Sequence, residues 1–371
     1  MSPHNRLRDA LIDRECVTRW NPADWGLAIR QARSANLLAA LGARFEGASE
    51  ALRVPESAKE HFSAVRHVIA QRNAAVRWEA GKIRDALARS GLKPIYLKGV
   101  AYVVAGLPLA GHRNFSDVDL MVPHNQIAQA ELSLTVAGWL PTNRDAYDQR
   151  YYRKWMHEIP PLQHIRRGTT LDLHHAISPP TAKYRARTSC LFDAQVAASE
   201  VEGVSVLSPA DMILHAATHL FAEGEVESGL RNLVDISELL QHFQGQPGFD
   251  AQLAARAFEI GLSRPVYYAL RYLDRILRQP ALETLTSALE PARPGGVALA
   301  LMDGIYDQVF QGHHPSVWAS GADWKRTALY LRGHWLRMPL HLLAPHLAMK
   351  SFRAYRAPVD ANPQPKETVQ L

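Results

Sequence analysis

The chain has 371 residues, a net charge of +6 and a hydrophobic fraction of 47%, which is typical of a globular protein of two or three domains. Its two cysteines, Cys16 and Cys190, lie far apart, so the sequence predicts neither a disulfide scaffold nor a cysteine-based zinc site. It shows no secretory signal and no apolar run of membrane-spanning length, so we expect a cytoplasmic protein.

Residues 1–85 are predicted to form a helical region. The segments 28–47 and 57–91 place apolar residues three and four positions apart, which is the spacing of a helix with one buried face. Pro55 marks a break before the second segment, and Gly91 marks its end.

Residues 86–185 are predicted to form a small α/β core, because short apolar runs alternate with helical patterns and turn residues. The expected elements are a strand at 93–99, a helix at 100–106, a loop at 108–115, a strand at 116–123, a helix at 124–139, a polar loop, a strand at 155–165 broken by Pro160 and Pro161, and a strand at 169–177.

Residues 186–357 are predicted to form a C-terminal helical domain, with a helix that begins at Ser208-Pro209. The tail 358–371 lacks apolar periodicity and is predicted to be disordered. The expected fold class is therefore α+β, with a small mixed sheet between two helical regions.

Two acidic residues two positions apart are the sharpest local feature. In a strand, Asp117 and Asp119 point to the same side, and their charges repel. A divalent cation relieves such repulsion, and oxygen-only ligands favour Mg²⁺ or Mn²⁺. Asp172, on the strand at 169–177, would complete a site for two ions that act on phosphorus. By itself such a pair is more often a solvated strand face.

The turn at Lys98-Gly99 suits a phosphate group. Glycine lets a backbone approach a ligand closely, and a helix that starts there offers free N–H groups. Lys98 could add charge, and Arg113 could contribute a bidentate fork, although each also suits an ordinary surface cation. His174 shares the face of Asp172 and could bond that residue or a phosphate, or simply pack in the core.

These motifs resemble those of the uncharacterised nucleotidyltransferases, a family of the DNA polymerase β-like superfamily that is often encoded in polysaccharide and peptide natural-product gene clusters. The matching motifs, between residues 93 and 240, are Leu97-Lys98-Gly99, Arg113, Asp117, Asp119-Leu120, Val122, Asp172-Leu173-His174, the segment 208–211 with His215 and His219, Leu230-Arg231 and Val234-Asp235. The superfamily's usual Gly-Ser turn is Lys98-Gly99 here, which implies a different grip on the phosphates.

The resemblance implies transfer of a nucleoside monophosphate from an NTP, with ATP as the default, and loss of pyrophosphate. Asp117 and Asp119 would bind two Mg²⁺ or Mn²⁺ ions, and Asp172 would bind one ion and orient or deprotonate the acceptor hydroxyl. Lys98, Gly99, Arg113, Ser116 and His174 would bind the nucleotide. The acceptor is left open among small molecules, sugars, peptides and proteins. The alternative is a catalytically silent nucleotide-binding or scaffold protein of a biosynthetic cluster.

Three further features have two interpretations each. Arg231 and Asp235, four residues apart, would pair along a helix or help to close the nucleotide cleft. His215 and His219 favour packing or substrate contact over zinc, because they lack the glutamate of a zinc-protease motif. The basic segment 322–357 would form packed helices with a solvated face, or contact an anionic membrane peripherally. The sequence shows no known nucleic-acid-binding module, so nucleic acid is the least favoured partner.

Overall fold

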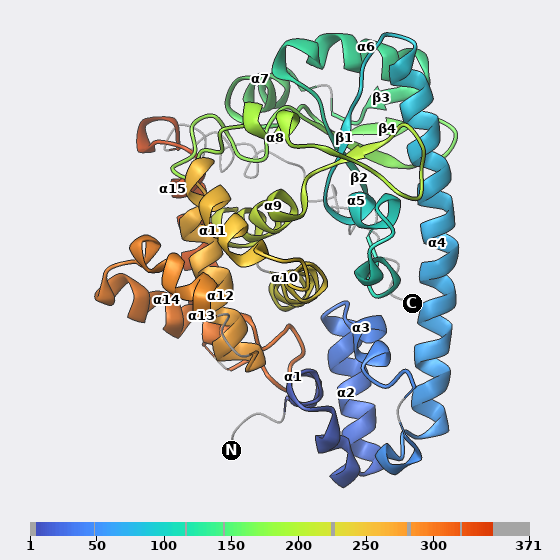
Figure 1. Ribbon diagram of the computed structural model, residues 1–371, viewed down its shortest axis with the longest axis vertical. Helices are drawn as coiled ribbons and strands as arrows, with labels where there is room; N and C mark the ends of the chain where they lie inside the picture. Colours follow the sequence, from blue (N-terminus) through green and yellow to red (C-terminus); the bar gives the residue numbers. More distant parts are fainter. Residues whose placement is uncertain are drawn as a thin grey trace, which may run out of the picture.

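The computed structural model describes residues 5–343, except 48, 116, 144, 224–226, 280–282 and 320. Within these residues it confirms the α+β prediction: helices flank a seven-stranded mixed sheet with the order β3-β4-β5-β2-β1-β7-β6 (Figure 1). The strands are β1 (Ile95–Tyr96), β2 (Asp117–Met121), β3 (Trp139–Pro141), β4 (Leu162–His164), β5 (Thr170–His174), β6 (Val196–Ala197) and β7 (Ser205–Val206).

The centre of the sheet has one apolar face and one acidic face. Strands β2 and β5 pair in parallel, with Val118 opposite Leu171 and Leu120 opposite Leu173, and all four side chains are buried. Strand β1 lies antiparallel to β2 and parallel to β7. Because successive side chains alternate in a strand, the acidic residues between these apolar positions point to the opposite face.

The N-terminal helices pack beside and below the sheet (Figure 1). They are α1 (Arg6–Ile12), α2 (Pro22–Ser34), α3 (Leu38–Ala43) and α4 (Glu56–Ala88). Helix α4 starts directly after Pro55, where the sequence predicts a break, and it is long enough to reach from α2 to the sheet. It covers the apolar face: the hydroxyl of the fully buried Tyr96 on β1 donates a 2.7 Å hydrogen bond to the carbonyl of Ala80.

Short helices complete the sheet region, and longer ones form the C-terminal part. Around the sheet lie α5 (Lys98–Val104), α6 (Ile127–Val136), α7 (Ala146–Trp155) and α8 (Ser189–Asp193). The later helices are α9 (Pro209–Ala222), α10 (Gly229–Phe243), α11 (Phe249–Glu259), α12 (Ser263–Leu277), α13 (Glu283–Ala288), α14 (Gly296–Val309) and α15 (Asp323–Arg337). Ser208 caps α9 by accepting from the Asp211 N–H, as the predicted helix start requires. Helices α9 and α10 lie between the sheet and the outer helices (Figure 1).

Several predicted elements differ. The predicted helix 124–139 ends at Val136, where β3 follows from Trp139, and the strands β6 and β7 form within the region 186–357, which was predicted to be helical. The polar segment before residue 155, predicted as a loop, contains α7, capped by the Asp145 side chain. No residue of α7 is buried and most of its residues are polar, so its sequence lacks the apolar residues that would predict a buried helix. The predicted strand 155–165 is reduced to β4 and one isolated bridge between Glu158 and His174, because two prolines remove the ladder donors between them.

The predictions for the C-terminal end and for the domain boundaries are tested only in part. Residues 344–371, with the end of the basic segment and the predicted disordered tail, lie outside the described residues. The division into domains at residues 85/86 and 185/186 stays a prediction. Among the helices that the structure describes, none has both the length and the apolar character to cross a bilayer.

Candidate active site

The register of β2 and β5 brings the three predicted carboxylates onto one face. Asp119 lies directly opposite Asp172, and Asp117, two residues earlier on β2, lies opposite Thr170. Since register partners and residues two apart share a side of the sheet, all three acids face away from α4. Their role as metal ligands stays a prediction.

The two acids of β2 are in different electrostatic states. Burial and the nearby charge of Asp119 raise the pKa of Asp117. Asp119 is only 3% exposed, and burial alone would raise its pKa too, but Lys98 and His174 hold that pKa well below its usual range. Asp119 is therefore an ionised carboxylate that is stabilised by Lys98 and His174. Asp117 is the acid whose ionised form is disfavoured by the repulsion between the two.

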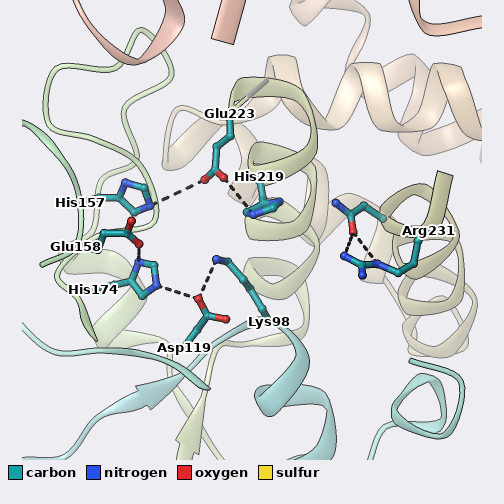
Figure 2. Close-up of polar contacts among 9 residues, drawn as sticks. Lys98, Asp119, His157, Glu158, His174, His219, Glu223 and Arg231 are labelled. Atoms are coloured by element: carbon teal, nitrogen blue, oxygen red, sulfur yellow. Dashed lines mark hydrogen bonds and ion pairs between the residues drawn. The ribbon is translucent and has the colours of Figure 1, made fainter. Parts of the chain in front are cut away.

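Lys98 directly contacts Asp119, one of the three acids on this face of the sheet. Its Nζ lies 2.9 Å from Asp119 Oδ1 (Figure 2). Burial acts to lower the pKa of Lys98, but the charges of Asp119 and Glu223 raise it more, so the side chain is an ammonium. Its backbone has φ +49°, a left-handed conformation that non-glycine residues seldom adopt and that often marks functional sites.

Gly99 is required by packing at the start of α5. A Cβ there would lie 2.6 Å from Cγ of Phe115, much closer than a van der Waals contact. The missing side chain thus lets the Phe115 ring sit against the first turn of α5, two residues before Asp117. Contact between Gly99 and a nucleotide stays a prediction, and the predicted nucleotide-binding residue Ser116 lies outside the described residues.

The predicted pairing of Arg231 with Asp235 is wrong. Asp235 of α10 instead forms an ion pair with Arg113, whose guanidinium also lies 5.6 Å from the centroid of the Tyr102 ring. Arg231 Nη2 and Nε donate to the Oδ1 of Asn232 at 3.1 and 3.3 Å (Figure 2). Burial, and then repulsion from Arg113, lowers the pKa of Arg231 to about 9, so it still carries its charge at neutral pH.

The partner of His174 is Asp119. His174 is 1% exposed, and its Nε2 lies 3.0 Å from Asp119 Oδ1. Because a carboxylate only accepts, Nε2 carries the proton, and Nδ1 offers its lone pair on the other side of the ring. His219 of α9 instead places Nε2 3.1 Å from Glu223 Oε2, and burial lowers the pKa of His215 to about 3.

Three site residues escape the sequence analysis: His157, Glu158 and Glu223. The Oε2 of Glu158 lies 3.3 Å from His174 Nδ1, and His157 Nε2 lies 3.9 Å from Glu223 Oε1 (Figure 2). Burial, and then the charge of Asp172, raises the pKa of Glu158 to about 8. The adjacent histidine and glutamate within the predicted strand 155–165 are the signal that the sequence offers, because charged residues buried in a sheet need partners.

The balance of charge favours cations. Among the described residues, each of five carboxyl groups lies close enough to another to shift a pKa, and Lys98 places an ammonium beside them. These carboxyl groups belong to Asp117, Asp119, Glu158, Asp172 and Glu223. Carboxyl groups that outnumber the nearby ammonium fit hard divalent cations with oxygen ligands, such as Mg²⁺ and Mn²⁺.

A family model described as "Uncharacterised nucleotidyltransferase" matches residues 21–278. This span runs from the start of α2 to the end of α12, so it includes the whole sheet and extends beyond the motifs at 93–240 on both sides. Comparisons with curated proteins and with solved structures find no match.

Proposed function

Because the chain belongs to the family of uncharacterised nucleotidyltransferases, we propose that it transfers a nucleoside monophosphate from an NTP to a hydroxyl group of an acceptor. The observation that carries this proposal is the parallel register of β2 and β5, which sets Asp172 beside Asp119 and on the side of Asp117. ATP is the default donor. The acceptor is a small molecule, sugar, peptide or protein, in keeping with a role in polysaccharide or peptide natural-product biosynthesis.

Asp117, Asp119 and Asp172 would hold Mg²⁺ or Mn²⁺, with two ions expected. Their fit rests on the donor chemistry: carboxylate oxygens, largely buried, with Asp117 carrying repulsion that a cation would relieve. When bound, such ions neutralise charge on the phosphates and on the oxygens that attack and leave.

The chain's own residues would bind, orient and accept a proton. The acceptor oxygen forms a bond to the α-phosphorus, while the bond from that phosphorus to the β-phosphate oxygen breaks, and pyrophosphate leaves with the electron pair. The acceptor proton passes to Asp172, which lies beside Asp119 at the centre of the sheet. Lys98 and Arg231, both cationic and close to the acids of β2, would bind the triphosphate.

The direct test measures label transfer and pyrophosphate release with each of the four NTPs, Mg²⁺ or Mn²⁺, and fractionated cell extract as the source of acceptor. Wild-type protein should transfer label from one of the four NTPs. The transfer rate of the isosteric Asp117→Asn variant should be lower by roughly 100-fold or more. Asp85→Asn, at a half-exposed carboxylate on α4, is the matched control and should stay active. Nucleotide binding without transfer by wild-type protein would favour the silent alternative, and full activity of Asp117→Asn would refute the proposed site.

A further inference from the structure

A second group of ligand-type side chains lies on the other side of His174 from Asp119. One ring nitrogen of His157, a carboxylate oxygen of Glu158 and a ring nitrogen of His174 all lie within 4.8 Å of one another (Figure 2). We propose that these three residues form a site for a divalent transition metal of the zinc type, separate from the aspartates proposed to hold Mg²⁺. This inference goes beyond the proposed function and does not depend on it.

The separation of the His174 and Glu158 ligand atoms suits a shared metal better than a hydrogen bond. His174 Nδ1 and Glu158 Oε2 are 3.3 Å apart, yet Nδ1 of His174 forms no hydrogen bond with any described residue. Ligand atoms about 2.0–2.1 Å from a tetrahedral metal stand about 3.4 Å from each other, which is close to this separation. Nδ1 of His157 is likewise buried without a hydrogen bond among the described residues. Two buried imidazole nitrogens that lack hydrogen bonds are costly unless something binds them.

Neighbouring groups hold the proposed ligands in place. The Nε2 of His174 is bound to Asp119, which leaves the lone pair on Nδ1, as the outer contact of a metal-bound histidine usually does. The His157 carbonyl accepts a 2.8 Å hydrogen bond from the N–H of His175, and Glu158 forms a bridge with His174. The short segment with two ligands is therefore fixed by its backbone to the end of β5.

The donor set selects the class of metal. Two imidazoles and one carboxylate suit Zn²⁺, Co²⁺, Mn²⁺ or Fe²⁺, whereas Mg²⁺ prefers oxygen ligands alone and retains water. Lys98 contributes a repelling charge, but its ammonium is already bound to Asp119, and Asp172 and Glu223 add two carboxyl groups near Glu158. With three protein ligands, the metal keeps a position for water or a substrate atom.

The test uses Co²⁺ as a coloured probe for the zinc-type site. Metal-free, full-length protein is titrated with Co²⁺ in excess Mg²⁺, and visible absorption and bound metal are measured. We expect the protein to bind one equivalent of Co²⁺ that excess Mg²⁺ does not displace. The visible absorption should be that of Co²⁺ with a low coordination number. His157→Ala and the isosteric Glu158→Gln should each weaken Co²⁺ binding at least about tenfold.

Two controls separate this proposal from the proposed function. His164→Ala removes a different buried histidine, on β4, and should bind Co²⁺ like wild type. Asp117→Asn should lose transfer activity but keep the Co²⁺ spectrum. Thermal melting checks that each variant folds. If His157→Ala does not fold, the Co²⁺ affinity of Glu158→Gln tests the proposal. Wild-type affinity for Co²⁺ in folded Glu158→Gln, or displacement of Co²⁺ by Mg²⁺, would overturn the proposal.

Discussion

Replacing Lys98 by methionine keeps most of the side-chain length and removes the ammonium from the acidic group. Nζ of Lys98 lies 2.9 Å from Asp119 Oδ1, and the two side chains are 24% and 4% exposed. At this separation two unit charges attract by about 6 kcal/mol at an effective dielectric constant of about 20, and desolvation offsets much of that. Removing one partner of a buried pair usually costs about 3–5 kcal/mol. Since Asp119 keeps its contact with His174, we expect Lys98→Met to lower the free energy of unfolding by about 3 kcal/mol in metal-free buffer.

The same substitution should strengthen metal binding. The Lys98 ammonium repels any cation that binds to Asp119, so the Lys98→Met variant should bind Mg²⁺ at least about tenfold more tightly, which is about 1.4 kcal/mol. Saturating Mg²⁺ should then restore more stability to the variant than to wild type.

Urea unfolding with EDTA and with saturating Mg²⁺ measures the stability change, and calorimetric titration measures affinity. Lys59→Met, at a lysine with a 58% exposed side chain on α4, is the control and should change neither quantity. If Lys98→Met loses as much stability with Mg²⁺ as without it, and its affinity for Mg²⁺ equals that of wild type, Lys98 and the metal do not share Asp119.

Three other substitutions test the site by urea unfolding in EDTA. The pKa of Glu158 is raised from 4.5 to about 8, so the folded protein holds a proton that the unfolded chain releases. The free energy of unfolding should therefore fall by up to about 1.4 kcal/mol per pH unit from pH 5 to 8. Glu158→Gln should remove this fall. Gly99→Ala should cost about 1–3 kcal/mol, because its methyl group meets Phe115. Asp235→Ala should cost about 3–5 kcal/mol, because it leaves Arg113 buried without its acid.

Each of these has its own control. The slope of stability against pH in Glu158→Gln should be shallower than in wild type between pH 5 and 8, and equal slopes would show that Glu158 titrates normally. Gly81→Ala, in α4, meets only the end of a side chain at 4.0 Å and should cost nothing. Asp303→Ala breaks a less buried pair with Arg271, so a loss as large as that of Asp235→Ala would contradict the role given to burial.

The acidic face was predictable because it depends on local geometry. The two-residue period of a strand fixes Asp117 and Asp119 on one side, whatever the rest of the chain does. The short apolar runs likewise predicted β1, β2 and β5 close to their observed positions. The register that sets Asp172 beside Asp119 joins strands about fifty residues apart, so the structure was needed to show it.

The contacts of the charged residues were not predictable in the same way. Lys98 and Arg113 were expected at phosphates, and the structure gives them acidic partners from other elements, Asp119 on β2 and Asp235 on α10. Which acid meets which base depends on how α10 packs near the sheet, and a helical spacing such as that of Arg231 and Asp235 carries no information about it.

Diffraction from crystals grown with Mn²⁺ and a non-hydrolysable NTP analogue tests the central claim most directly, because the anomalous signal of manganese locates the ion. We predict a peak within coordination distance of the carboxylates of Asp117, Asp119 and Asp172, with the triphosphate of the analogue beside it. Bound analogue with manganese away from all three carboxylates would contradict the account.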